Sequence, residues 1–284
     1  MNLACIMPAR NEGWCIGASA RVALRWCDFL AVLDHASDDD TADIVASLSD
    51  EFPGRVYTLR EDNPEWREMH HRQSLLDFAR SLGATHIAPV DADEILAADQ
   101  IPGIRSAISA LPPGGFLSMP MRNLHRSLAH YRADDSDFGS RAGTMLAFAD
   151  RSGVTWSPAN GYDHHQRSPR GSRQARFMEC SGILHLQFAN WRRLLAKHRL
   201  YKVMERHKYP QKPVSEIERI YNNAPNEAGL RTKPVPPEWW HGDIAAHIDL
   251  NREPWQIAES GRIIGLHGPG YFRGLSLWPE ELAA

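Results

Sequence analysis

The first hundred residues alternate short apolar runs with longer segments of helical periodicity. Four of the runs have the length and composition of buried strands, at residues 3–8, 29–34, 55–60 and 85–91. Apolar side chains at helical spacing lie between them, in residues 12–26, 41–52 and 66–83. Strands and helices that alternate in this way form βαβ units around a mainly parallel sheet. We therefore predict the α/β class, with ligands bound at the carboxyl ends of the strands.

The second half of the chain has a different pattern. It contains two strand-like runs, a polar loop and a strongly basic helix, at residues 114–124, 144–150, 157–174 and 189–208. From about residue 209 onward Pro and Trp are frequent, so we expect irregular wrapping there. No internal repeat and no low-complexity linker divides the sequence, which favours one continuous domain.

Composition argues against several classes of protein. A formal net charge of -3 is not that of a nucleic-acid binder, which usually carries a basic excess. No apolar run approaches the roughly 20 residues of a membrane span, and the first residues lack the features of a signal peptide. Without CxxC or metal-ligand spacing, the cysteines are interpreted as reduced thiols of a cytoplasmic protein: Cys5, Cys15, Cys27 and Cys180.

The sequence THIAPVDADEIL, residues 85–96, ends an apolar run with three carboxylates, Asp91, Asp93 and Glu94. Carboxylates two residues apart at the end of a strand can reach one point, and hard oxygen ligands suit Mg or Mn where phosphate oxygens complete the shell. Taken alone, the same pattern also fits a charged turn or an Asp that caps the next helix.

Two further motifs follow the first and second predicted strands. They are PARNEG from Pro8 and DHASDDDT at residues 34–41, and a helix carrying Arg72 runs into DADE. Over residues 3–97 these ordered motifs resemble the family-two glycosyltransferases of the GT-A fold. The family's second loop has the form D-D-x-S-x-D-x-T, so His35 replaces its second Asp here.

This resemblance implies a GT-A type, Rossmann-like sheet with a donor side in residues 1–115 and an acceptor side in residues 116–284. It implies a hexosyltransferase-like enzyme that moves a sugar from a UDP- or GDP-sugar to a hydroxyl of a glycan or lipid-linked glycan, as in cell-envelope polysaccharide synthesis. Inversion is the commoner outcome in the family. Retention stays open, because a histidine-completed metal site also occurs in retaining relatives.

Roles for individual residues follow from the same resemblance. Base and ribose are expected to contact Pro8, Arg10, Glu12 and Asp34. Ser37, Asp38 and Thr41, in contrast, are expected to build the turn and cap the next helix, and capping of this turn is also the alternative role of Asp34.

The phosphate side of the donor is expected to involve the helix and the DADE motif. By the resemblance, Arg72 lies near the nucleotide, Asp91 contacts the ribose or the metal, and Asp93 binds Mn or Mg. Glu94 supports the metal shell or the donor sugar. A downstream histidine completes the metal site in some relatives, and His185 is the candidate, with His267 as its rival.

An inverting transfer also needs a base for the acceptor hydroxyl. The carboxylates considered are Asp135, Asp137, Asp163 and Glu179, and we favour Asp163 because its loop, GYDHHQR, is rich in groups suited to sugar binding. The basic helix at residues 190–208 is a candidate for peripheral contact with an anionic membrane or for holding acceptor phosphates. A solvated helix face explains the same residues.

Three other functions share some features with this sequence. A haloacid-dehalogenase-like phosphatase carries its D-x-D on the first strand, with Thr or Val two residues after the second Asp. Here the motif follows the fourth strand, and position 95 is Ile. A sugar nucleotidyltransferase opens with a Gly-rich G-x-G-T-R loop that PARNEG lacks. A catalytically degenerate nucleotide-sugar-binding protein stays open, and nucleotide binding without turnover would indicate it.

Overall fold

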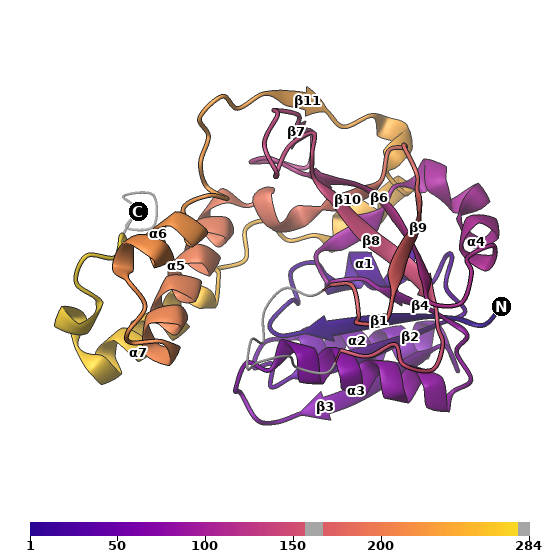
Figure 1. Ribbon diagram of the computed structural model, residues 1–284, viewed down its shortest axis with the longest axis horizontal. Helices are drawn as coiled ribbons and strands as arrows, with labels where there is room; N and C mark the ends of the chain where they lie inside the picture. Colours follow the sequence, from indigo (N-terminus) through magenta and orange to yellow (C-terminus); the bar gives the residue numbers. More distant parts are fainter. Residues whose placement is uncertain (157–166, 278–284) are drawn as a thin grey trace. The chain divides into compact units, whose positions relative to one another are not determined.

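Figure 1 shows the computed structural model, in which residues 1–156 and 167–277 are described. The chain forms two compact units. The first consists of Met1–Arg122, Arg141–His185 and Pro236–Asp249, and the second of Asn123–Ser140, Leu186–Val235 and Leu250–Ala284. The boundary expected between residues 115 and 116 falls within a strand of the first unit.

The first unit is built on a sheet whose N-terminal part is parallel. Its order is β3-β2-β1-β4, from the strands β1 (Leu3–Ala9), β2 (Phe29–His35), β3 (Val56–Glu61) and β4 (His86–Pro89). Three helices connect these strands: α1 (Ile16–Ala23), α2 (Thr41–Glu51) and α3 (Glu68–Ser81). The α/β class and the alternation predicted for the first hundred residues are therefore confirmed.

Beyond β4 the sheet continues with mixed strand directions. Strand β8 (Gly143–Ala149) pairs antiparallel with β4 and with β6 (Gly115–Asn123), while β9 (Arg173–Phe177) pairs parallel with β6. The far end of the sheet holds β10 (Ile183–His185) and β5 (Glu94–Leu96), which are antiparallel. Helix α4 (Ile101–Ser109) lies between β5 and β6 in the chain, after the short 3-10 turn η1 (Ala98–Gln100). Two more 3-10 turns, η3 (Pro237–Trp239) and η4 (Gly242–His247), complete this unit.

Helix α3 packs an apolar face on the parallel strands. Leu75, Leu76 and Ala79 of this face belong to one buried core with Ile6 of β1 and Leu33 of β2. In a βαβ unit the connecting helix begins at the carboxyl edge of the sheet, since it runs back against the strands. The first turns of α3 therefore lie where the strands end.

The second unit is mainly helical. It contains α5 (Trp191–Lys208), α6 (Val214–Tyr221), α7 (Gln256–His267) and the short antiparallel pair β7 (His130–Arg132) and β11 (Thr232–Pro234), with the 3-10 turns η2 (Leu186–Phe188) and η5 (Pro269–Phe272). The irregular wrapping expected after residue 209 is wrong for α6 and α7. Ile263 of α7 packs against Leu200 and Val203 of α5, so burial against a neighbouring helix stabilises a segment that contains two glycines.

Helix α5 confirms the helix predicted near residues 189–208, but much of its basic character is used inside the second unit. Arg193, Arg199 and Lys202 are buried. The Lys202 ammonium lies 3.1 Å from the Glu218 carboxylate and donates to the Asn222 amide oxygen at 2.7 Å. Fewer basic side chains are therefore exposed than the sequence suggests, and membrane contact stays a prediction. No helix in the described part of the chain is long and apolar enough to cross a membrane.

Two buried histidines make the stability of this fold sensitive to acid. The rings of His35 and His71 lie 4.2 Å apart between centroids, and burial, with the charges of His35 and His70, lowers the pKa of His71 to about 4. In the unfolded chain His71 has an ordinary pKa of about 6.5 and is protonated below that pH, whereas in the folded chain it stays neutral down to about pH 4. The free energy of unfolding therefore falls with decreasing pH across that window.

We expect the wild type to lose about 2 kcal/mol more stability than His71→Gln between pH 7.5 and pH 4.5. Urea unfolding of both proteins at the two pH values measures this difference. Parallel losses in the two proteins would contradict the assignment of the acid sensitivity to His71.

Candidate functional site

Strands β1, β2 and β4 end at the same edge of the first unit's sheet. Their register places Ala9 beside Asp34 and Ile6 beside Pro89, so the loops that follow start next to one another. These loops carry the PARNEG, HASDDDT and DADE sequences. The arrangement brings three motifs that are far apart in the sequence to one edge, where α/β proteins bind their ligands.

The loops after β1 and β2 are joined by hydrogen bonds. Asn11 has a positive φ of 54°, and its side-chain oxygen accepts from the Asp38 backbone N–H at 2.9 Å. In return, the Ser37 hydroxyl accepts from the Asn11 N–H at 3.0 Å, and the Thr41 hydroxyl accepts from the Glu12 N–H at 2.9 Å. The polar side chains of this segment thus build the turn, as expected. The expected helix cap is not formed in this way, because the N-cap residue of α2, Asp40, makes no side-chain cap hydrogen bond.

Asp34, expected to contact the base, is buried at the end of β2. Its carboxylate accepts from the Ser37 N–H at 3.2 Å and forms an ion pair with Arg60 of β3. Arg60 itself is half exposed, with 47% of its side-chain surface accessible. A ligand that contacts Asp34 at this edge would therefore also contact Arg60. The contact between Asp34 and the base stays a prediction.

The other residues expected on the nucleoside side lie in the loop after β1. Arg10 donates to the Pro64 carbonyl at 2.7 Å. The Glu12 carboxylate accepts from the Trp14 indole N–H at 2.6 Å and is turned toward the start of α1. Pro8 is partly exposed at the end of β1. Their nucleotide contacts also stay predictions.

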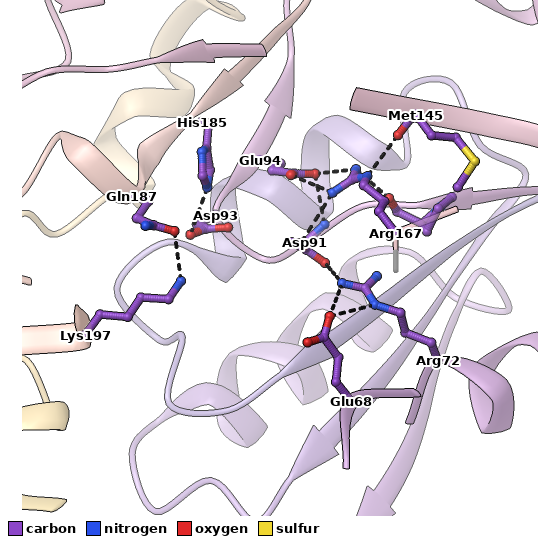
Figure 2. Close-up of polar contacts among 11 residues, drawn as sticks. Glu68, Arg72, Asp91, Asp93, Glu94, Met145, Arg167, His185, Gln187 and Lys197 are labelled. Atoms are coloured by element: carbon purple, nitrogen blue, oxygen red, sulfur yellow. Dashed lines mark hydrogen bonds and ion pairs between the residues drawn. The ribbon is translucent and has the colours of Figure 1, made fainter. Parts of the chain in front are cut away.

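Arg72 is buried on α3 and is held between two carboxylates. Its Nε donates to Glu68 at 3.0 Å, and its Nη2 donates to Asp91 at 2.9 Å (Figure 2). The remaining nitrogen, Nη1, is buried and has no hydrogen-bond partner in residues 1–156 and 167–277. An unpaired buried donor is costly, so this N–H group fits an oxygen atom of a ligand bound at the same edge.

Asp93 and His185 lie side by side, with Oδ2 of Asp93 3.5 Å from Nε2 of His185 (Figure 2). The pairing of β10 with β5 sets His185 opposite Glu94, next to Asp93. The structure therefore places the downstream histidine next to the DADE motif, as the resemblance implies. The rival, His267, stacks on Tyr271 in the second unit at 4.9 Å between ring centroids.

The carboxylate of the Asp93–His185 pair suits Mn or Mg, whereas the imidazole suits Mn better than Mg, which prefers oxygen ligands such as those of a phosphate. The Asp93–His185 pair fits such an ion. Asp91, the third expected ligand, has its two oxygens on Arg72 and on a second arginine instead. Accordingly, the described ranges contain no group of three or more His, Cys, Asp or Glu side chains arranged to hold a metal.

The second arginine, Arg167, was missed by the sequence analysis. Its guanidinium binds both oxygens of Glu94 at 2.6 Å and one oxygen of Asp91 at 3.3 Å. Burial raises the pKa of Glu94 and the charge of Arg167 opposes the rise. Burial also acts to raise the pKa of Asp91, but the charges of Arg72 and Arg167 outweigh it and lower that pKa below its ordinary value.

Arg167 gave no signal in the sequence, because it lies in a polar loop without periodicity.

None of the residues described so far is assigned as the carboxylate that would deprotonate an acceptor hydroxyl. Asp163, the favoured candidate, lies outside the described residues. Asp135 is exposed and pairs with Arg231 at 2.7 Å in the second unit. Asp137 and Glu179 are exposed.

Comparison with solved structures finds partial similarity to glycosyltransferases. S. aureus TarS (residues 1–349) in complex with UDP is 16% identical at a TM-score of 0.38, covering 44% of this chain and 36% of that one. GalNAc-T7 with UDP, GalNAc and Mn2+ is 11% identical at a TM-score of 0.34, covering 44% and 24%. The mannosyltransferase PcManGT from Pyrobaculum calidifontis, with GDP-Man and Mn2+, is 12% identical at a TM-score of 0.39, covering 94% and 75%.

The part of TarS that this chain matches is well under two thirds of that structure's length. No family model and no curated protein matches the sequence. With identities this low the similarity concerns the fold, and the functional argument rests on the residues of the site itself.

Proposed function

We propose that this protein is a glycosyltransferase that binds a nucleoside-diphosphate sugar at the carboxyl edge of β1, β2 and β4. The observation that carries the proposal is the Asp93–His185 pair beside the ion pair of the buried Arg72 with Asp91, at the end of a parallel strand. Together they offer ligands for a cation and an N–H group for an oxygen of the donor. The acceptor is a hydroxyl of a glycan or lipid-linked glycan, and the transfer inverts the anomeric centre.

Each group at this edge has a distinct role in the proposal. Arg72 donates its unpaired N–H to an oxygen of the ribose or diphosphate, and Asp91, about one third exposed, accepts from a ribose hydroxyl. Asp93 and His185 hold Mn or Mg, which supplies positive charge to the departing nucleoside diphosphate. The base and ribose contact Pro8, Arg10, Glu12 and Asp34, and the UDP- or GDP-sugar is used in the cytoplasm. Asp163 remains the proposed base.

Nucleotide binding gives the direct test. We expect either UDP or GDP, together with Mn, to raise the melting temperature, because a ligand that binds only the native state stabilises it by mass action. A thermal-shift panel of UDP, GDP, CDP and TDP, each with and without Mn, measures this effect. A folded protein that responds to none of the nucleotides would overturn the proposal, and binding without sugar transfer would instead indicate a degenerate binding protein.

A further inference from the structure

Arg167 is bound through every one of its N–H groups. Its Nε donates to the Met145 carbonyl at 2.9 Å, and Nη2 donates to the Pro89 carbonyl at 2.6 Å and to Glu94. Its Nη1 donates to Glu94 and Asp91. A guanidinium has five N–H donors, so all of them are used, and only 16% of the side chain is exposed. This geometry fixes the guanidinium between β4, β5 and β8.

The contacts of Arg167 divide the three carboxylates of DADE into two classes. Glu94 is 2% exposed, and its two oxygens accept from Arg167 and from the Asp91 N–H at 3.1 Å. Asp91 has one oxygen on Arg72 and the other on Arg167. Asp93 is turned toward His185 instead (Figure 2). Two carboxylates are thus bound by arginines, and the third lies beside the imidazole.

We propose that Arg167 makes cation binding depend on the nucleotide. By holding Asp91 and Glu94, it keeps two strong oxygen ligands from the cation, so that Asp93 and His185 are its protein ligands. Two protein ligands bind Mn or Mg weakly, because water fills the other positions, and phosphate oxygens of the nucleotide strengthen the binding by replacing some of that water. Arg167 is therefore a positioning residue, which acts through the carboxylates that it holds. This inference rests on the proposed function, because it concerns the same site.

The test is a Mn2+ titration followed by electron paramagnetic resonance, which reports free Mn2+ independently of activity. Arg167→Met frees Glu94 and the second oxygen of Asp91 from the guanidinium, while Arg72 still holds the first oxygen of Asp91. We therefore expect Mn2+ to bind at least tenfold more tightly without nucleotide than it does to the wild type. The gain in Mn2+ affinity on adding UDP or GDP should shrink correspondingly. A purely structural role would weaken Mn2+ binding both with and without nucleotide, and unchanged affinities would also overturn the inference.

Two further variants keep the test decisive. If the unpaired Glu94 prevents Arg167→Met from folding, the double variant Arg167→Met/Glu94→Gln removes that buried charge and still frees the second oxygen of Asp91. It should bind Mn2+ without nucleotide more tightly than the wild type, and wild-type affinity would overturn the inference. Arg80→Met is the matched control, since Arg80 binds both oxygens of Asp150 at 2.8 Å. Its Mn2+ affinity should equal that of the wild type.

The two proposals fail in different ways. A wild type that binds neither UDP nor GDP with Mn2+ would contradict the glycosyltransferase proposal. A wild type that binds Mn2+ with one of them, but whose Arg167 variants keep the same nucleotide dependence, would contradict only the role of Arg167.

Discussion

Asp93→Asn is expected to reduce sugar transfer by about a thousandfold. The change removes the charged oxygen that faces His185 and keeps the size of the side chain. In the proposed function, the cation at the departing diphosphate would then lose its anionic protein ligand. A loss of about 4 kcal/mol of charge stabilisation corresponds to this factor. Release of the nucleoside diphosphate from the donor identified by the thermal-shift panel, followed over a range of Mn concentrations, measures the effect.

The free energy of unfolding of Asp93→Asn shows whether a slower reaction results from the lost charge or from a destabilised fold. Asp91 and Asp93 repel each other, so removing the second charge should leave the free energy of unfolding unchanged or slightly higher. Asp77→Asn is the control, because Asp77 is an exposed carboxylate on α3 that accepts from Gln73 at 2.8 Å. An Asp93→Asn enzyme that keeps more than a tenth of the wild-type rate, with the same Mn dependence, would rule out the assigned role.

The parallel half of the sheet was predictable because its signals are local. β1 to β4 are short apolar runs with helices of clear periodicity between them. The structure shifts the bounds of these four strands by only one or two residues. Once these strands are parallel and adjacent, the meeting of PARNEG, DHASDDDT and DADE at one edge follows from topology. His185 was named from the family resemblance, and the structure places it at the end of the short strand β10.

The missed features depend on contacts between distant segments. Arg167 lies 73 residues from Glu94 in the sequence, and neither its own loop nor its neighbours show a pattern that would join the two. Helix α7 contains Gly261 and Gly265, which lower its intrinsic propensity, and it is stabilised by burial against α5. Such tertiary contacts cannot be predicted from the periodicity or the composition of the sequence.

Arg72→Met is expected to have the second large effect, on both stability and nucleotide binding. Loss of the guanidinium leaves Glu68 and Asp91 without their shared cation. Removing one partner of a buried ion pair costs about 3–5 kcal/mol, and because Asp91 is 34% exposed we expect about 2–3 kcal/mol here. The lost N–H donor should also weaken binding of the nucleoside diphosphate about thirtyfold, equivalent to about 2 kcal/mol. Urea unfolding and calorimetric titration measure the two effects.

Arg80→Met separates these two effects, because Arg80 lies on the same helix and also binds an aspartate through two of its nitrogens. It should lower the free energy of unfolding and leave nucleotide affinity unchanged. Arg72→Lys keeps the charge but offers donors from a single point, so it cannot hold Glu68 and Asp91 and still reach a ligand. We therefore expect it to recover part of the stability and little of the affinity. Equal losses of affinity in Arg72→Met and Arg80→Met would mean that Arg72 acts only through the stability of α3, and the nucleotide would then have to be held by the loops after β1 and β2 alone.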